Sequence, residues 1–150
     1  MKEILITLEL SMLPISELRG AIPYGLSKSI PFWNVFFISI IGNLLPVIPL
    51  YFLLEDFLNF FSKFRYGKKF TNYIVNRTKS RSKIVDTYKT IGLLIFVGIP
   101  LPMTGAWTGT LAAVIFQLKF KNYLIGIIGG VLMAGIIVSL VTLGITKFIF

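Results

Sequence analysis

Two long runs without a charged residue constrain this chain more than any other feature. Phe32 to Leu54 holds 23 uncharged residues, and Asn122 to Thr146 holds 25. A helix of about 20 apolar residues crosses a hydrocarbon core of about 30 Å. The chain of 150 residues has a mean hydropathy of +0.84 and is only 14% charged, whereas a soluble domain usually carries about 25% charged residues. We therefore expect a single all-α integral membrane domain over residues 1–150.

Two further apolar regions are interrupted by helix-breaking residues. Leu10 to Ser16 is followed at once by the charged segment Glu17 to Gly25, and Thr90 to Leu118 is broken near its middle by Ile99-Pro100-Leu101-Pro102. The first region is short, and each limb of the second is about 10 to 14 residues long, which is typical of a re-entrant segment rather than a full crossing. We expect the helix before the second break to end there, because proline removes a donor and restricts its predecessor. We expect Thr104 to cap the helix that follows.

The two halves of the chain resemble each other. Arg19-Gly20-Ala21 matches Thr104-Gly105-Ala106 at an offset of 85, and Phe32-x-Asn34 matches Phe120-x-Asn122 at an offset of 88, which places Gly42 on Gly130. Each half has a broken hairpin and then a long helix, over residues 1–54 and 90–150. A re-entrant hairpin returns to its own side and the next helix crosses, so the second unit is inverted. Transporters with such inverted repeats bind substrate near the midplane, where broken helices meet.

The segment that joins the halves, residues 55–89, is strongly basic. Nine of the fifteen Lys and Arg residues lie between Lys63 and Lys89, where Asp86 is the only acid. A run of this kind indicates either a patch for nucleic acid or anionic lipid, or a short cytoplasmic loop that follows the positive-inside rule. In so apolar a chain we favour the cytoplasmic loop and expect no nucleic-acid partner. The loop would still rest on anionic lipid headgroups.

The same linker carries a helical pattern of aromatic residues. Apolar residues between Phe57 and Phe64 alternate with polar ones at roughly helical spacing, which predicts an amphipathic helix in the membrane interface. The polar stretch Asn76 to Lys83 predicts a loop or a frayed helix end.

The composition argues against an enzyme. The chain has no cysteine and no histidine. It therefore has no disulfide framework and no thiolate, and it lacks the usual general base and the commonest transition-metal ligand. We find no nucleophile–base pair and no cluster of metal ligands, and we expect no cofactor.

The charged segment between apolar stretches is the strongest candidate for a functional site. Lipid has no water to satisfy bare charges, and an unpaired arginine at the bilayer centre costs about 2.5 to 3.5 kcal/mol. Arg19 should therefore pair with Glu17 or bind an anionic group, since arginine binds phosphate and carboxylate through two parallel bonds. Glu17 is a candidate proton carrier, because burial favours a neutral carboxyl group. The alternative is a wet loop at the membrane surface with both side chains solvated.

We expect the two hairpin tips, Glu17 to Gly25 and Pro100 to Gly109, to face each other. The first tip would supply the charge, and the second would supply hydroxyls, backbone donors and Trp107. The indole either stacks on a substrate or anchors the chain at the membrane interface, and the prolines chiefly set the shape. The candidate substrate-binding and coupling residues are Glu17, Arg19, Gly20, Pro23, Pro100, Pro102, Thr104, Gly105, Trp107 and Thr108.

At these residues the chain resembles the family of putative small multidrug export proteins. The matching motifs are Glu17-Leu18-Arg19-Gly20-Ala21-Ile22-Pro23 and Ile99-Pro100-Leu101-Pro102-x-Thr104-Gly105-Ala106-Trp107-Thr108-Gly109. Met103 stands where family members often have glycine, a change that should stiffen the second tip. The plan is also distantly similar to the DedA membrane proteins, which have paired re-entrant hairpins and are linked to the movement of lipid phosphates. The resemblance implies transport.

Three functions follow from this reading. The first is a small transporter or exporter, with proton coupling as an option. The second is flipping or scrambling of an anionic lipid such as a polyprenyl phosphate, and the third is a structural or pore-forming membrane protein. We expect a multi-pass protein of the plasma membrane that forms a homodimer or larger assembly, because a monomer would enclose the site poorly. Re-entrant hairpins would place both termini on the other side of the membrane from the basic loop. Fully spanning hairpins would place the termini and the loop on the same side.

Overall fold

The computed structural model describes residues 1–102 and 104–149, and every regular element in that part of the chain is a helix. This confirms the all-α prediction. Met103, the residue that departs from the family pattern, lies outside the described residues. The helices are α1 (Lys2–Met12), α2 (Glu17–Ser27), α3 (Phe32–Ser62), α4 (Arg65–Arg81), α5 (Lys83–Gly98), α6 (Ala106–Ile115) and α7 (Phe120–Ile149).

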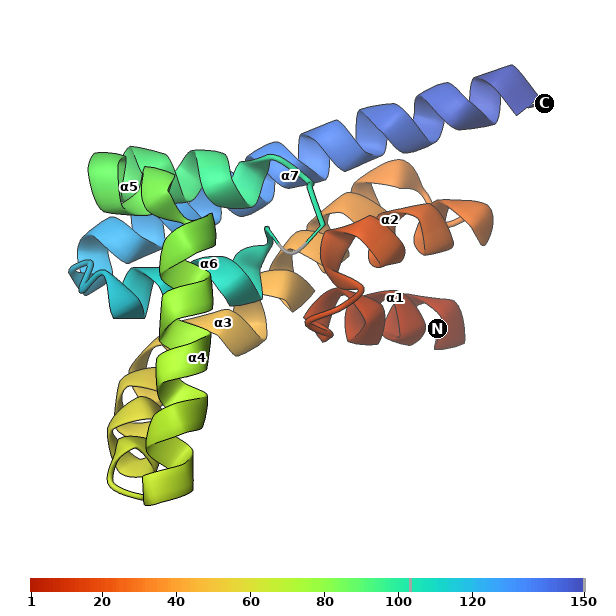
Figure 1. Cartoon of the computed structure of the whole chain (residues 1–150). Helices are drawn as coiled ribbons and strands as arrows, with labels where there is room; N and C mark the ends of the chain where they lie inside the picture. The colour runs from red at the N-terminus through yellow and green to blue at the C-terminus, as the bar shows by residue number, and fades with distance from the viewer. Residues whose placement is uncertain (103, 150) are drawn as a thin grey trace.

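The helices form two hairpins and two long helices that hold them together (Figure 1). The α1–α2 hairpin lies at the end of the molecule where α7 ends, and the α5–α6 hairpin lies at the other end, next to α4. The two hairpin connections come together in the middle. The long helices α3 and α7 are long and apolar enough to cross a membrane.

Proline sets the first break of each hairpin. Leu13 is extended, with a ψ of 138°, because the following Pro14 disfavours helical backbone at its predecessor. Ile99, before Pro100, is extended as well, with a ψ of 114°, so α5 ends at Gly98 as predicted.

The charged segment is not itself the first tip, which is a correction to the sequence analysis. The connection is Leu13 to Ser16, and the chain then enters α2 at Glu17, whose φ of 47° marks the turn. The segment to Gly25 is helical throughout, with Pro23 accepted inside α2. In the second hairpin the connection ends at Gly105, and the motif beyond it starts α6.

Helices occupy most of the linker 55–89. The long helix α3 continues to Ser62, and the polar stretch Asn76 to Lys83 contains the end of α4, which is the predicted helix end rather than the predicted loop. The physical reason is tertiary packing: α4 lies against α3 and α6. Non-helical backbone at Lys89 then bends α5, so the straight limb of the second hairpin begins near the predicted boundary at residue 90.

The core lies where the hairpins meet the long helices. Each first limb packs on its own long helix, α1 on α3 and α5 on α7. Each second limb packs on both long helices, so α2 also contacts α7 and α6 also contacts α3. Fully buried side chains at these contacts include Ile22, Leu93, Tyr123 and Ile127. This arrangement holds the two connections against each other.

Candidate functional site

Glu17 is buried at the junction of the two connections, with 7% of its surface exposed. Its Oε1 atom accepts the backbone N–H of Trp107 at 3.3 Å. The carboxylate lies so close to Gly105 that a Cβ atom there would be 2.0 Å from Oε2. Helix α6 has no side-chain cap from its own N-cap residue. Glu17 therefore caps α6 from the other half of the chain, where the free N–H groups and the helix dipole favour a negative charge.

Thr104 does not cap α6, which corrects the sequence prediction. Its hydroxyl lies 2.8 Å from the carbonyl oxygens of Ile99 and Leu101, and it accepts the N–H of Leu101 at 3.1 Å. A threonine hydroxyl forms such local bonds readily in turns. Thr104 therefore closes the second connection on itself and leaves the start of α6 to Glu17.

Arg19 reaches across the junction and donates a hydrogen bond to the backbone carbonyl of Thr104. Although Arg19 and Glu17 both belong to the described chain, no ion pair joins them. Both residues lie on α2, where side chains two positions apart point in different directions. The two charges of the first half thus bind two different backbone groups of the second half.

Trp107 makes a third bond across the junction. Its indole N–H donates to the carbonyl oxygen of Met12 at 3.2 Å. Met12 is the last residue of α1, where helical carbonyls have no partner within the helix. The indole thus satisfies a carbonyl oxygen at the end of α1, and Trp107 has a structural role.

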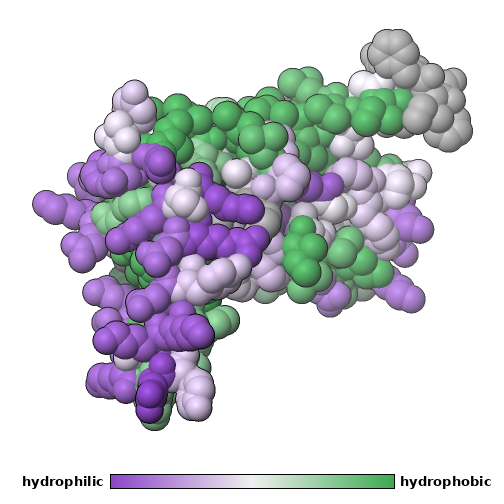
Figure 2. Space-filling view, viewed as in Figure 1, coloured by the Kyte–Doolittle hydropathy of each residue, from purple (hydrophilic) through white to green (hydrophobic). Residues whose placement is uncertain are grey.

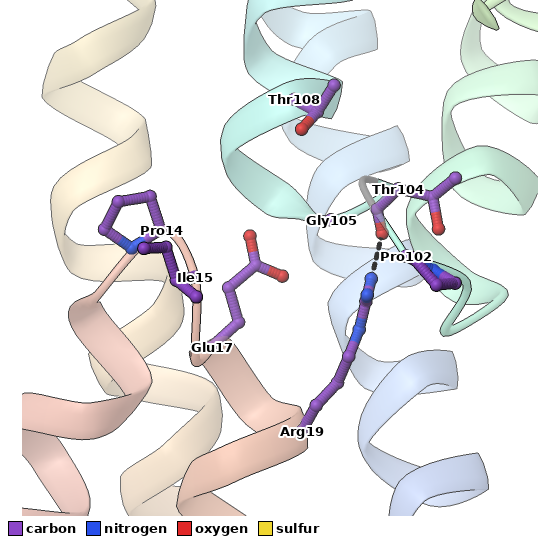
Figure 3. Close-up of a pocket in the computed structure, with 8 residues that line it drawn as sticks. All are labelled: Pro14, Ile15, Glu17, Arg19, Pro102, Thr104, Gly105 and Thr108. Carbon is purple, nitrogen blue, oxygen red and sulfur yellow. Dashed lines mark hydrogen bonds between the residues drawn. The ribbon is translucent and has the colours of Figure 1, made fainter.

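A partly open cavity of about 420 Å³ lies between the two connections (Figure 3). Figure 3 shows Glu17 and Arg19 extending from α2 toward the second connection, with the Arg19 bond to Thr104 drawn as a dashed line. Small-molecule sites usually occupy about 300 to 1,000 Å³. The residues that line the cavity are Pro14, Ile15, Glu17, Arg19, Pro102, Thr104, Gly105 and Thr108.

Six of the ten candidate residues line this cavity, and four lie elsewhere. Trp107 makes the bonds described above, Gly20 packs against the Ser16 side chain, and Pro23 lies inside α2. Pro100 lies in the second connection but not among the lining residues.

The sequence motifs do not identify Pro14 and Ile15 as site residues. Both line the cavity because the first connection precedes Glu17 rather than following it. The proline at position 14 was the available signal, since a helix ends before a proline.

Asn43 is a polar residue that the sequence analysis did not single out. It is 1% exposed and its Oδ1 atom has no hydrogen-bond partner among the described residues. It borders a void of about 10 Å³ that Glu17 and Arg19 also line, roughly the space of one water molecule. An asparagine inside a long uncharged run was the signal that could have found it.

These features define a class of protein: a small helical membrane protein in which a buried glutamate and a half-buried arginine lie where two helical hairpins meet. Within the described residues, no group of three or more Asp, Glu, His or Cys side chains could hold a metal ion. A family model described as "Putative small multi-drug export protein" matches residues 17–137, and the chain belongs to this family. The match begins at Glu17, the residue that caps α6. No curated protein and no solved structure matches the chain.

Proposed function

We propose that this chain is a small transporter of the plasma membrane, built from two inverted repeats. Each repeat would be a re-entrant hairpin followed by a transmembrane helix. The order of elements supports this, since α1, α2 and α3 are followed, after α4, by α5, α6 and α7. The reciprocal packing of α2 on α7 and α6 on α3 also supports it. When two repeats enclose a shared site, the second limb of each hairpin is expected to pack on the long helix of the other repeat.

Two glycines at matching positions give further support to the repeat. A Cβ atom on Gly42 would lie 3.0 Å from the carbonyl oxygen of Leu8, and one on Gly130 would lie 3.0 Å from that of Leu94. The glycines are 88 residues apart and the leucines 86. In each half, the long helix approaches the first limb of its own hairpin through a glycine, as closely packed membrane helices do.

The arrangement in Figure 1 favours re-entrant hairpins. The chain's first helix and the end of α7 lie at one end of the molecule, and α4 lies at the other. If α3 and α7 cross the bilayer, each hairpin returns to the side that it entered. Both chain ends then lie opposite the basic helix α4, which the positive-inside rule assigns to the cytoplasm. Reporter fusions at each end and after Ser82 test this, and cytoplasmic ends would contradict it.

The observation that carries the transport proposal is that the charged residues lining the cavity also hold the two connections together. Opening this junction requires Glu17 to leave the start of α6 and Arg19 to leave the Thr104 carbonyl. Protonation of Glu17 would remove its charge and weaken its attraction to the helix N-terminus. Proton binding and opening of the junction are thereby linked.

The same groups suggest what the cavity binds. An anionic or hydrogen-bond-accepting substrate would compete with the Thr104 carbonyl for Arg19, whose guanidinium binds carboxylate and phosphate well. It would also compete with Glu17 for the N–H groups at the start of α6. The substrate would bind Arg19 and the start of α6, and the proton would bind Glu17. Substrate and proton would therefore both act on the same site.

Transport is tested with purified protein in liposomes under a pH gradient, with the anionic dye lucifer yellow as the probe. We expect Arg19→Ala to abolish gradient-driven uptake and Arg19→Lys to retain part of it, because lysine keeps the charge but not the planar fork. Glu17→Gln keeps an oxygen for the Trp107 N–H but exchanges no proton, so its uptake should lose the dependence on the gradient. Lys119→Ala, at an exposed cation, is the control. Unchanged uptake by Arg19→Ala would remove the junction from the mechanism.

Translocation of an anionic lipid is the second candidate. The cavity is partly open, and Ile15 at its edge is 96% exposed, so an apolar tail has a way out while Arg19 holds the phosphate. The measurement is the dithionite accessibility of fluorescent phosphatidylglycerol in the same liposomes. Lipid movement that Arg19→Ala abolishes, without lucifer yellow uptake by the wild type, would favour this candidate.

A structural or pore-forming role is the third candidate. It predicts leakage of a trapped dye such as calcein at a rate that neither Arg19→Ala nor Glu17→Gln alters. The liposomes used for lucifer yellow uptake provide this measurement directly.

We also propose a homodimer or larger assembly. The apolar side chains beside the cavity are exposed, by 51% at Leu13, 96% at Ile15 and 55% at Leu101. A second copy placed against them would close the cavity from the lipid. Light scattering in a mild detergent measures the assembly, and a monomer that remains active in transport would contradict the proposal.

A further inference from the structure

Helix α4 packs threonine and aliphatic residues on its neighbours and exposes its aromatic residues. Thr71 and Thr78 are 8% and 7% exposed, and Ile74 and Val75 on the same face are half-buried. Tyr66, Phe70 and Tyr73 are 90%, 53% and 59% exposed. In a soluble helix with one packed face, large apolar side chains such as these normally lie on that face. The exposed aromatic residues therefore need an apolar or interfacial environment outside the described chain.

The exposed aromatic residues form one stripe along α4. Positions 66, 70 and 73 share a face at helical spacing, and position 77 continues it. Arg77 at that position donates a hydrogen bond to the Tyr73 hydroxyl at 2.7 Å, and its guanidinium lies 5.9 Å from the centre of the Tyr73 ring. We call Tyr66, Phe70, Tyr73 and Arg77 the aromatic stripe. It combines rings with a cation, as side chains do at the boundary between lipid tails and headgroups.

The rest of the exposed surface of α4 is basic. The helix contains no acidic residue, and its cations are Arg65, Lys68, Lys69, Arg77, Lys79 and Arg81. Figure 2 shows hydrophilic side chains over the viewer's side of α4 and over its junction with α5. Such a surface is complementary to anionic headgroups, which attract basic segments next to a membrane.

The end of α3 beside α4 adds an apolar surface. Phe57 and Phe60 are 46% and 57% exposed. They border an open groove of about 650 Å³ whose other lining residues are Leu50, Leu53, Leu54 and Asp56. Figure 1 shows the last part of α3 and α4 running together away from the body of the molecule and across the direction of α7. If α7 crosses the bilayer, this pair lies along its surface.

We propose that α4 is an anionic-lipid-binding helix that lies in the membrane interface with the aromatic stripe at the level of the headgroups. Its cations bind anionic phospholipid, and the apolar end of α3 faces the lipid tails. This surface is separate from the cavity between the hairpins. The proposal therefore stands or fails independently of transport.

The absence of cysteine from the chain makes a clean test possible, because single-cysteine variants have no background. Phe70→Cys places a nitroxide label on the aromatic stripe. Asn72→Cys, two residues on and about 200° round the helix, is the matched control, and both positions are exposed. The full chain is studied in nanodiscs of phosphatidylcholine alone or mixed with phosphatidylglycerol. Collisions with oxygen report lipid, and collisions with a nickel chelate report water.

We expect the label at position 70 to collide with oxygen at least about threefold more often in mixed nanodiscs than in phosphatidylcholine, while the label at position 72 stays in water. Replacing Lys68, Lys69 and Arg77 together with glutamine should remove this difference between the lipids. Equal water access at positions 70 and 72 in both lipids would overturn the proposal. Shielding of position 70 that is the same in detergent micelles, or that requires added RNA, would also overturn it, since a second copy or nucleic acid would then be the occupant.

Discussion

The α1–α2 hairpin contributes two charged side chains to the junction, whereas the α5–α6 hairpin contributes backbone groups and one uncharged side chain, that of Trp107. Glu17 and Arg19 of the first meet the start of α6 and the Thr104 carbonyl of the second. The hairpins share an order of helices and a glycine contact with the long helix, but the second connection is the longer one. A longer connection can present free N–H and C=O groups to a partner. The difference shows how two similar units acquire one asymmetric site.

The largest effect should come from filling the space at Gly105 compared with its sequence match, Gly20. A Cβ atom at position 105 would lie 2.0 Å from Oε2 of Glu17 and 2.4 Å from Oε1, the oxygen that accepts the Trp107 N–H, whereas at position 20 it would meet the Ser16 hydroxyl at 2.1 Å. That hydroxyl can rotate away. Gly105→Ala should therefore lower the free energy of unfolding by about 2 to 4 kcal/mol, from overpacking and loss of the cap. Gly20→Ala should cost less than half as much.

Unfolding of both variants is followed in mixed micelles with increasing dodecyl sulfate. Equal losses at the two glycines would mean that the Glu17 cap contributes nothing specific to the junction. Transport by Gly105→Ala should fall together with stability, because displaced Glu17 no longer lines the same cavity.

The next effect distinguishes the two glycines of the long helices. A Cβ atom at Gly130 would lie 2.7 Å from the Cβ of Val97, which cannot move without its backbone. At Gly42 it would lie 1.9 Å from the hydroxyl of Ser11, which can turn. We expect Gly130→Ala to cost about 1 to 3 kcal/mol, and Gly42→Ala to cost less.

A second substitution, at the residue that each glycine contacts, tests the cause of each loss of stability. Ser11→Ala removes the clashing oxygen and should restore most of the stability that Gly42→Ala loses. Val97→Ala should give Gly130→Ala no relief, because alanine keeps the Cβ atom. The same mixed-micelle unfolding measurement applies, and relief by both second substitutions would show that the contacts are not those of the structure.

The junction between the hairpins also shows which features could be predicted from the sequence and which could not. The helix ends were predictable because they follow local rules: Pro14 and Pro100 end helices, and the uncharged runs form α3 and α7. The residue that caps α6 was not predictable. Thr104 is a residue type that commonly caps helices, but its hydroxyl is hydrogen-bonded within the turn. The cap comes instead from Glu17, which accepts the backbone N–H of Trp107, 90 residues further along the chain.

The cavity was predictable only in part, for the same reason. The motifs identified the residues of the second connection, and Glu17 and Arg19, but placed the first connection several residues too late. Which residues line the cavity depends on how the two connections meet, and the bond made there joins Arg19 to Thr104, 85 residues away in the chain. Of the two forms predicted for Asn76 to Lys83, a loop or a helix end, the structure has the end of α4, whose packing against other helices outweighs its polar composition.

A smaller effect should follow from removing one bond of the second hairpin to the first. Trp107→Phe removes the indole N–H that serves the Met12 carbonyl and keeps an aromatic ring. The expected loss is about 1 kcal/mol, the usual net contribution of one hydrogen bond. Trp33→Phe is the control, because Trp33 is 64% exposed. If thermal unfolding of the two variants in detergent coincides, the indole bond does not hold α1 to α6.

The smallest effect should come from Asn43, a position at which the two halves carry different side chains. Its counterpart at an offset of 88 is Val131, so the second half has an apolar side chain where the first has an amide. Asn43→Leu has nearly the same shape and removes an oxygen without a partner. Exchanging such a group for an apolar one is close to neutral or stabilising, so we expect unfolding in mixed micelles to shift by less than about 0.5 kcal/mol. A larger loss of stability would mean that the amide binds something in the void beside Glu17 and Arg19, and a loss of gradient-driven lucifer yellow uptake without a loss of stability would place that ligand in the transport cycle.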